Sequence, residues 1–70
     1  MANQISVLGV EGMSCIHCEN AVKKSVGMLN GVSSVSVDLK GKKVTVEYDT
    51  DKVSIDTIKG TIEDQGYDVK

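Results

Sequence analysis

The 70-residue chain contains no Pro, no Trp and no Phe, and only two Tyr residues, Tyr48 and Tyr67. It also has no Arg, and its eight Lys residues are outnumbered by ten Asp plus Glu, for a net charge of -2. Proteins that bind nucleic acid need a basic surface for the phosphate backbone and commonly stack bases on aromatic rings. This composition therefore argues against nucleic acid as a partner.

Long hydrophobic runs are missing as well. No apolar stretch approaches the roughly 20 residues that a membrane span requires, and the N-terminal residues lack the basic start and apolar segment of a signal peptide. We therefore expect a cytoplasmic protein without membrane insertion. With 40% hydrophobic and 26% charged residues the chain has the composition of a globular domain, and its length allows a single domain over residues 1–70.

Hydrophobic periodicity predicts a strand, a helix and a strand in the first half of the chain. The first strand covers residues 5–10, and a loop follows over 11–14, where Gly12 supplies backbone freedom. A helix then runs from about residue 15 to residue 29, ended by Asn30 and Gly31. Its apolar stripe consists of Cys18, Val22, Val26 and Leu29. Alternation then predicts a strand over residues 32–39.

The second half repeats the order strand, helix, strand. A turn at Gly41 leads into a strand over residues 44–49, so that these two neighbouring strands form a hairpin. Ser54 caps a second helix, which Gly66 ends, and residues 67–70 form a short final strand. The apolar stripe of that helix is Ile55, Ile58 and Ile62, and Asp56 lies near its positive end.

This order predicts an α/β (α+β) fold, a ferredoxin-like βαββαβ sandwich with a four-stranded antiparallel sheet and two helices on one face. In the first strand Ile5 and Val7 make one face strongly apolar, whereas Leu8 and Val10 make the second only partly so. We expect the helices to cover the Val and Ile stripes, and the Ser, Thr and acidic positions to form the open face. Three further residues, Lys40, Lys42 and Lys43, are expected to be solvated at the hairpin tip.

The two cysteines, Cys15 and Cys18, stand at the predicted junction of the first strand and the first helix. Disulfide-stapled domains usually have more cysteines at wider spacing, so this pair indicates metal or redox chemistry. The spacing lets both sulfur atoms turn toward one point near the surface. The positive end of the helix dipole should lower the thiol pKa values and favour thiolates.

The number of available ligands narrows the choice of metal. A structural zinc site has four ligands, whereas this chain offers two Cys and a single His, His17. Cu(I) prefers sulfur ligands and accepts two or three of them, so that two thiolates can hold it. The open side of such a site would let a partner's thiolate add before the first ligands leave, which favours a metal carrier that performs no catalysis.

The segment Gly-Met-Ser-Cys-Ile-His-Cys at residues 12–18 resembles the metal-binding motif of the heavy-metal-associated domain family, and the resemblance extends over the whole chain. The C-terminal segment Ile62–Val69 also resembles the family pattern. Within the family the chain is most similar to free-standing bacterial copper chaperones. This resemblance implies that Cys15 and Cys18 bind Cu(I) and pass it to the metal-binding domain of a copper-exporting P-type ATPase. A copper-bridged homodimer at high loading would also agree with it.

Supporting residues around the pair are Met13, His17 and Tyr67. Met13 could add a thioether ligand, although an apolar residue that fixes the loop to the core is the favoured interpretation. His17 should point outward and either is simply solvated, tunes the thiolates or adds a ligand when two chains share copper. The resemblance places Tyr67 near the metal loop, as a core aromatic that also shields the site. Lys23 and Lys24 are expected to be solvent-facing.

Three alternatives stay open. A Cys-x-x-Cys pair at a helix N-terminus also suits a thiol–disulfide oxidoreductase, but the chain is short for a thioredoxin-like domain and lacks the cis-proline of that family. A second alternative keeps the fold and changes the cargo to Hg(II), Zn(II) or Cd(II), although a periplasmic mercury scavenger would need a signal peptide. The third is a module of a metal-pumping ATPase; the initiating Met, the complete set of elements and Tyr67 favour a free-standing protein.

Overall fold

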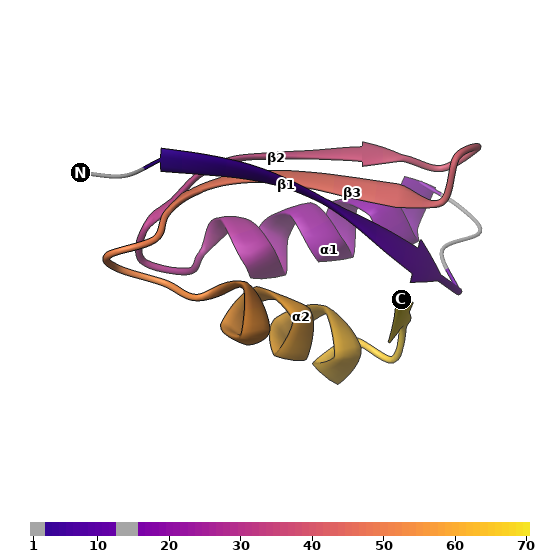
Figure 1. The fold of residues 1–70 in the computed structure, drawn as a ribbon. Helices are drawn as coiled ribbons and strands as arrows, with labels where there is room; N and C mark the ends of the chain where they lie inside the picture. The colour runs from indigo at the N-terminus through magenta and orange to yellow at the C-terminus, as the bar shows by residue number, and fades with distance from the viewer. Residues whose placement is uncertain (1–2, 13–15) are drawn as a thin grey trace.

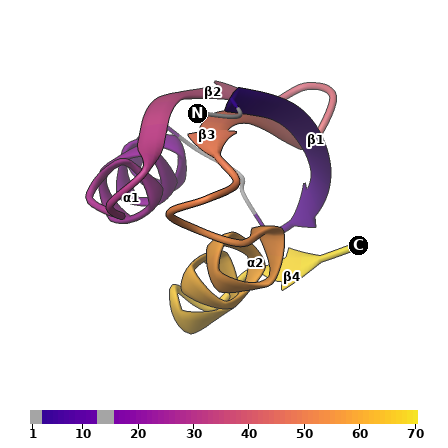
Figure 2. The same cartoon turned by 60° about the vertical axis from the view of Figure 1, so that its left-hand side comes forward.

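The computed structural model describes residues 3–12 and 16–70. Its elements are, in order, β1 (Asn3–Glu11), α1 (Ile16–Gly27), β2 (Val32–Asp38), β3 (Lys43–Asp49), α2 (Ile55–Asp64) and β4 (Asp68–Val69). The strands form one sheet in the order β2-β3-β1-β4, with every neighbouring pair antiparallel. Both helices lie on the same face of that sheet (Figures 1 and 2). The ferredoxin-like βαββαβ sandwich is thus confirmed.

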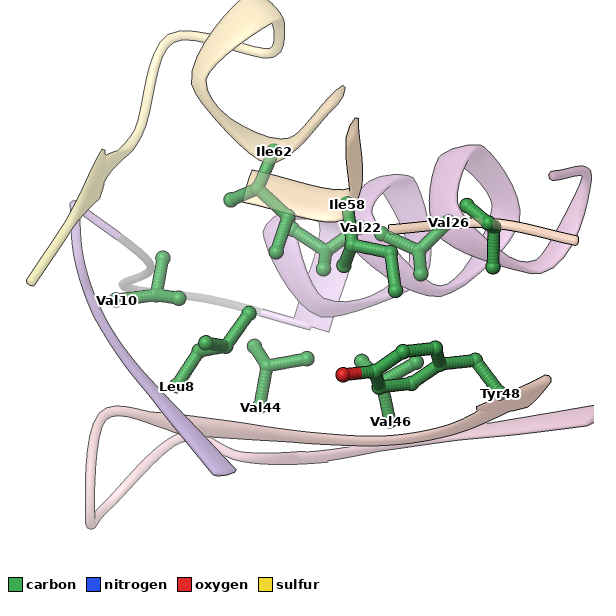
Figure 3. Close-up of a cluster of buried hydrophobic side chains, with 10 residues drawn as sticks. Leu8, Val10, Val22, Val26, Val44, Val46, Tyr48, Ile58 and Ile62 are labelled. Atoms are coloured by element: carbon green, nitrogen blue, oxygen red, sulfur yellow. The ribbon is translucent and has the colours of Figure 1, made fainter. Parts of the chain in front are cut away.

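The hydrophobic core lies between the sheet and the two helices. Figure 3 shows the side chains of α1 and α2 facing those of β3, and the residues involved are Val22, Val26, Ile58, Ile62, Val44, Val46 and Tyr48. The aliphatic members of this set are fully buried. Each such side chain stabilises the fold by about 1.5–3 kcal/mol relative to an exposed one. The core therefore fixes both helices against the sheet.

The face of β1 that packs against the core is not the predicted one. Leu8 and Val10 face the core, at 5% and 0% exposure, whereas Ile5 and Val7 are 65% and 57% exposed on the open face. The more apolar face of this strand is therefore the outer one, and the helices do not cover it. In the observed register with β3, Ser6 is also on the core side, where its hydroxyl lies 3.2 Å from the phenol oxygen of Tyr48. A shift by one residue would remove this partner and expose Leu8.

Helix α1 ends at Gly27 and not at the predicted Leu29. The last α-type hydrogen bond runs from the Met28 amide to the Lys24 carbonyl at 3.1 Å, and the Leu29 amide then bonds to the Val26 carbonyl in a tighter turn. Gly27 has a low helix propensity, and this weakens the last turn. Leu29 still packs against the core, although it lies outside the helix.

The predicted boundaries of α2 are confirmed. Ser54 precedes the helix, and its hydroxyl accepts a hydrogen bond from the Thr57 amide at 3.2 Å. Gly66 follows the helix with a φ of +95°, a left-handed conformation that glycine adopts without strain. The final strand β4 is shorter than predicted, since it comprises only Asp68–Val69. No helix within the described residues has the length and apolarity that a membrane crossing requires.

Candidate metal centre

The junction between β1 and α1 carries the cysteine pair. Gly12 directly follows β1 and has a φ of +102°, a conformation that agrees with its predicted role in a loop. Helix α1 begins at Ile16. Cys18 therefore lies in the first turn of α1, whereas Met13 and Cys15 lie outside the described residues. The structure thus describes one of the two predicted sulfur ligands directly.

Cys18 is half-buried and packs against the hydrophobic core. It shares the core-facing side of α1 with Val22, which is four residues further on and fully buried. Side chains of a helix lean toward its N-terminus, so the thiol of Cys18 is directed toward the start of α1. The two residues before it, Ile16 and His17, are exposed, in agreement with the expected outward position of His17.

The electrostatics of this helix end favour an anionic ligand group. The first amide groups of α1 have no carbonyl partner within the helix, and the helix dipole adds partial positive charge there. Glu19 in the same turn forms an ion pair with Lys23 at 3.2 Å. Both side chains are partly exposed, so that this pair contributes only about 0–1 kcal/mol. Lys23 and Lys24 are exposed, as predicted.

Tyr67 lies beside the start of the loop. If Gly12 carried a Cβ, this atom would be 3.2 Å from Cδ1 of Tyr67 and 3.8 Å from its Cα. The ring therefore rests on the backbone of residue 12, half-buried and in contact with the core. The pairing of Glu11 with Asp68 holds the two segments together. Tyr67 thus contacts the residue that precedes residues 13–15, and Cys18 lies in the helical turn that follows them.

Two further contacts at this end of the molecule were not predicted from the sequence. The Val10 amide donates to the Lys42 carbonyl at 2.8 Å, which fixes the β2–β3 hairpin to the end of β1. Glu11 forms an ion pair with Lys70 at 3.2 Å. Both contacts join residues far apart in the chain, and periodicity carries no signal for such pairs. The hairpin lysines Lys40, Lys42 and Lys43 are exposed, as expected.

Within residues 3–12 and 16–70, no three His, Cys, Asp or Glu residues gather into a group that could hold a metal ion. The predicted pair of thiolates includes Cys15, which lies outside these residues. In the described part, Cys18 lies in the first turn of α1, and Tyr67 contacts Gly12 just after β1. Cys18 thus offers a sulfur ligand at a positive helix end.

Residues 7–68 match the sequence model of the heavy-metal-associated domain family. The chain therefore belongs to the heavy-metal-associated domain family. It is 61% identical over 62 residues to the copper chaperone CopZ of Bacillus subtilis, covering 89% of this chain and 90% of that protein. It is 56% identical over 64 residues to the CopZ of Staphylococcus haemolyticus, covering 91% of this chain and 94% of that protein.

Solved structures agree with this assignment. A CopZ metallochaperone superimposes with a TM-score of 0.94 at 46% identity, covering 96% of this chain and all of that one. The N-terminal domain of a potential copper-translocating P-type ATPase from Bacillus subtilis, solved in the Cu(I)-loaded state, has a TM-score of 0.94 at 29% identity. That likeness covers 99% of this chain and 86% of the ATPase domain. The same fold thus occurs in a carrier and in a domain of a pump.

Proposed function

We propose that residues 1–70 form one domain that acts as a cytoplasmic copper chaperone, with Cys15 and Cys18 as the ligands of Cu(I). The observation that carries the proposal is the position of Cys18 in the first turn of α1, three residues after Cys15 and at the end of the molecule where Gly12 turns the chain. The identity of 61% to one bacterial copper chaperone and 56% to another supports copper as the cargo.

The ligand chemistry agrees with this cargo. Cu(I) is a soft ion that prefers thiolates and accepts low coordination numbers. The dipole at the start of α1 favours the negative charge of thiolates. Cys18 is held by its packing against the core, so that one ligand is positioned before copper arrives. Such a site binds copper without a third protein ligand and leaves one side open.

Three neighbouring residues support the pair in this proposal. Tyr67, whose ring rests on Gly12, limits access of water and oxygen to the thiolates. Met13 fixes the loop to the core by its apolar side chain. His17 is exposed and can affect the thiolates or contribute when two chains share one ion. Only Cys15 and Cys18 are assigned as metal ligands.

The open side of the site determines what happens to the cargo. A thiolate of a docked domain adds to the copper ion, and the ligands Cys15 and Cys18 then leave one after the other. No bond of an organic substrate is made or broken, so that the protein is a carrier and not an enzyme. The structural likeness to a Cu(I)-loaded ATPase domain supports such a domain as the acceptor. A copper-bridged homodimer would form by the same exchange when no acceptor is present.

The test is a transfer experiment between separated proteins. The Cu(I)-loaded chain is mixed without oxygen with an equal amount of a copper-free ATPase metal-binding domain, and the two are then separated and analysed for copper. The proposal predicts that a large share of the copper moves to the domain within the mixing time. A Cys18→Ser variant serves as the control for loading. If copper stays with the chain, or reaches the domain only at the rate of release to a chelator, direct transfer is wrong.

A disulfide exchange assay separates this function from the redox alternative. The chain in its reduced form is incubated with a protein disulfide, and thiol transfer is followed over time. A copper chaperone is expected to reduce the disulfide no faster than a simple thiol of the same concentration. Turnover that depends on both Cys15 and Cys18 would instead support a thiol–disulfide oxidoreductase.

A further inference from the structure

Strand β1 is paired along only part of its outer edge. On its inner side it pairs with β3 from Asn3 to Gly9, whereas on the other side β4 pairs with Val10 and Glu11 alone. The Lys70 amide adds one hydrogen bond to the Gly9 carbonyl at 2.7 Å. In the described structure no strand lies opposite residues 3–8 on this side, and Figure 1 shows β1 running well past the short β4. Such an edge is a template for another strand.

The direction of the backbone groups along this edge follows from two hydrogen bonds. The Val10 amide points to the β3 side, where it donates to Lys42, and the Gly9 carbonyl points to the opposite side, where it accepts from Lys70. In an antiparallel sheet successive residues direct their N–H and C=O groups alternately to the two sides. Ile5 and Val7 therefore direct theirs the same way as Gly9, out of the sheet.

The side chains of the same two residues are apolar and exposed. Ile5 is 65% and Val7 57% exposed, and no residue from 3 to 10 carries a charge. Proteins usually block an open edge with charges, proline or a bulge. The other edge, β2, is different, because its open-face residues include Ser34 and Ser36 and its register shifts just before Ser34. The apolar, uncharged edge is thus the one formed by β1.

We propose that β1 pairs with β1 of a second copy of the chain and joins the two sheets into one. The pairing is antiparallel about a twofold axis beside Ser6, with Ile5 opposite Val7 of the second copy. The twofold axis generates two such pairs. Both exchange backbone hydrogen bonds, because Ile5 and Val7 direct their N–H and C=O groups to this edge. Their side chains then meet on the open face, where cross-strand aliphatic contacts stabilise the pairing.

A second copy matches this edge better than a strand of other composition. The occupant must be uncharged over the paired residues and must present apolar side chains on one face, and β1 itself meets both conditions. Antiparallel pairing about a twofold axis makes the edge complementary to itself. Residues 3–10 bring no like charges together, although each chain has a net charge of -2. The pairing uses neither Cys15 nor Cys18 and is independent of the proposed copper function.

The test is sedimentation equilibrium of the reduced, copper-free chain, from about 10 μM to about 1 mM. We expect a dimer that grows with concentration. Val7→Lys places two like charges close together across the twofold axis and is expected to raise the dissociation constant about tenfold or more. The matched control is Thr45→Lys, since Thr45 lies beside Val7 on the same face but on the inner strand β3, away from the edge. This control should dimerise like the unsubstituted chain.

A second measurement does not depend on any substitution. Amide hydrogen exchange of the unsubstituted chain should slow at Ile5 and Val7 when the concentration rises, with no such change at Ser34 or Ser36. A Cys15→Ser/Cys18→Ser variant should dimerise equally well. A monomer at every concentration would overturn the proposal and leave the edge to an extended segment of another protein. A dimer lost in the cysteine variant, or weakened more by Thr45→Lys than by Val7→Lys, would overturn it too.

Discussion

Tyr67 occupies the space that a side chain on Gly12 would need. A Cβ at position 12 would lie 3.2 Å from Cδ1 of Tyr67, and Gly12 has a φ of +102°. The backbone conformation therefore favours glycine at this position, and a Cβ there would also press against the ring of Tyr67. This contact connects the residue just before residues 13–15 to the segment that precedes β4.

Gly12→Ala should destabilise the protein by about 1–2 kcal/mol, because an L-residue is strained at this φ and its Cβ would press on Tyr67. Chemical denaturation of the reduced, metal-free protein measures this difference. The same variant should bind copper more weakly, because the loop must shift to relieve the contact. Unchanged stability would show that the ring and the loop move apart without cost.

Gly60→Ala is the matched substitution, and it is expected to raise stability where Gly12→Ala lowers it. Gly60 lies within α2, and apart from its chain neighbours and the nearby backbone of α2 itself, no heavy atom of the described chain lies within 4 Å of a Cβ built there. Alanine should therefore stabilise the helix by about 0.5–1 kcal/mol without changing copper affinity. The same denaturation experiment measures the effect. A loss of stability here would mean that the surroundings of α2 are tighter than the structure shows.

Much of the fold could be predicted because the apolar residues follow the period of each element. Val44, Val46 and Tyr48 alternate on β3, and Ile58 and Ile62 recur at helical spacing on α2, and all of them are buried. Local signals also fixed two boundaries, the Ser54 cap and the Gly66 stop. These features depend on neighbours in the chain and need no knowledge of the tertiary structure.

The rest depends on contacts between distant segments. Both faces of β1 contain apolar residues, and the sequence alone predicted that Ile5 and Val7 face the core, whereas Leu8 and Val10 do so in the structure. The hydrogen bond between the Ser6 and Tyr48 hydroxyls accompanies the observed register, and no local sequence pattern predicts it. The position of Tyr67 beside the loop came from the family resemblance, and its contact with Gly12 came from the structure. Cys15 lies outside the described residues, so that its role stays a prediction.

Tyr67→Ala should expose the cysteine pair. The variant loses the ring that rests on Gly12, and its half-buried packing contributes about 2 kcal/mol to stability. We expect the two thiols to oxidise faster in air than those of the unsubstituted protein, as measured by thiol titration over time. Tyr67→Phe keeps the ring and should oxidise at the original rate. Equal rates in all three proteins would contradict a shielding role for the ring.

Ser54→Ala should reduce the stability of the protein and leave its copper affinity unchanged. The Ser54 hydroxyl accepts a hydrogen bond from the Thr57 amide at 3.2 Å, and loss of such a cap costs about 1 kcal/mol. The cap is at the N-terminal end of α2, and the copper proposal makes no use of it. Thermal unfolding should show a lower midpoint while the copper affinity of the folded protein stays unchanged. A parallel fall in affinity would indicate coupling between the two helices that the account does not contain.

The central claim is that Cys15 and Cys18 together hold Cu(I), and an anaerobic titration of the reduced protein against a competing Cu(I) chelator tests it most directly. The comparison is a Cys15→Ser/Cys18→Ser variant, with a parallel Zn(II) titration of the unsubstituted chain. We expect tight binding of about one Cu(I) per chain, absent from the variant and much stronger than the binding of Zn(II). Weak Cu(I) binding by the folded, reduced protein, or equal binding by the variant, would contradict it.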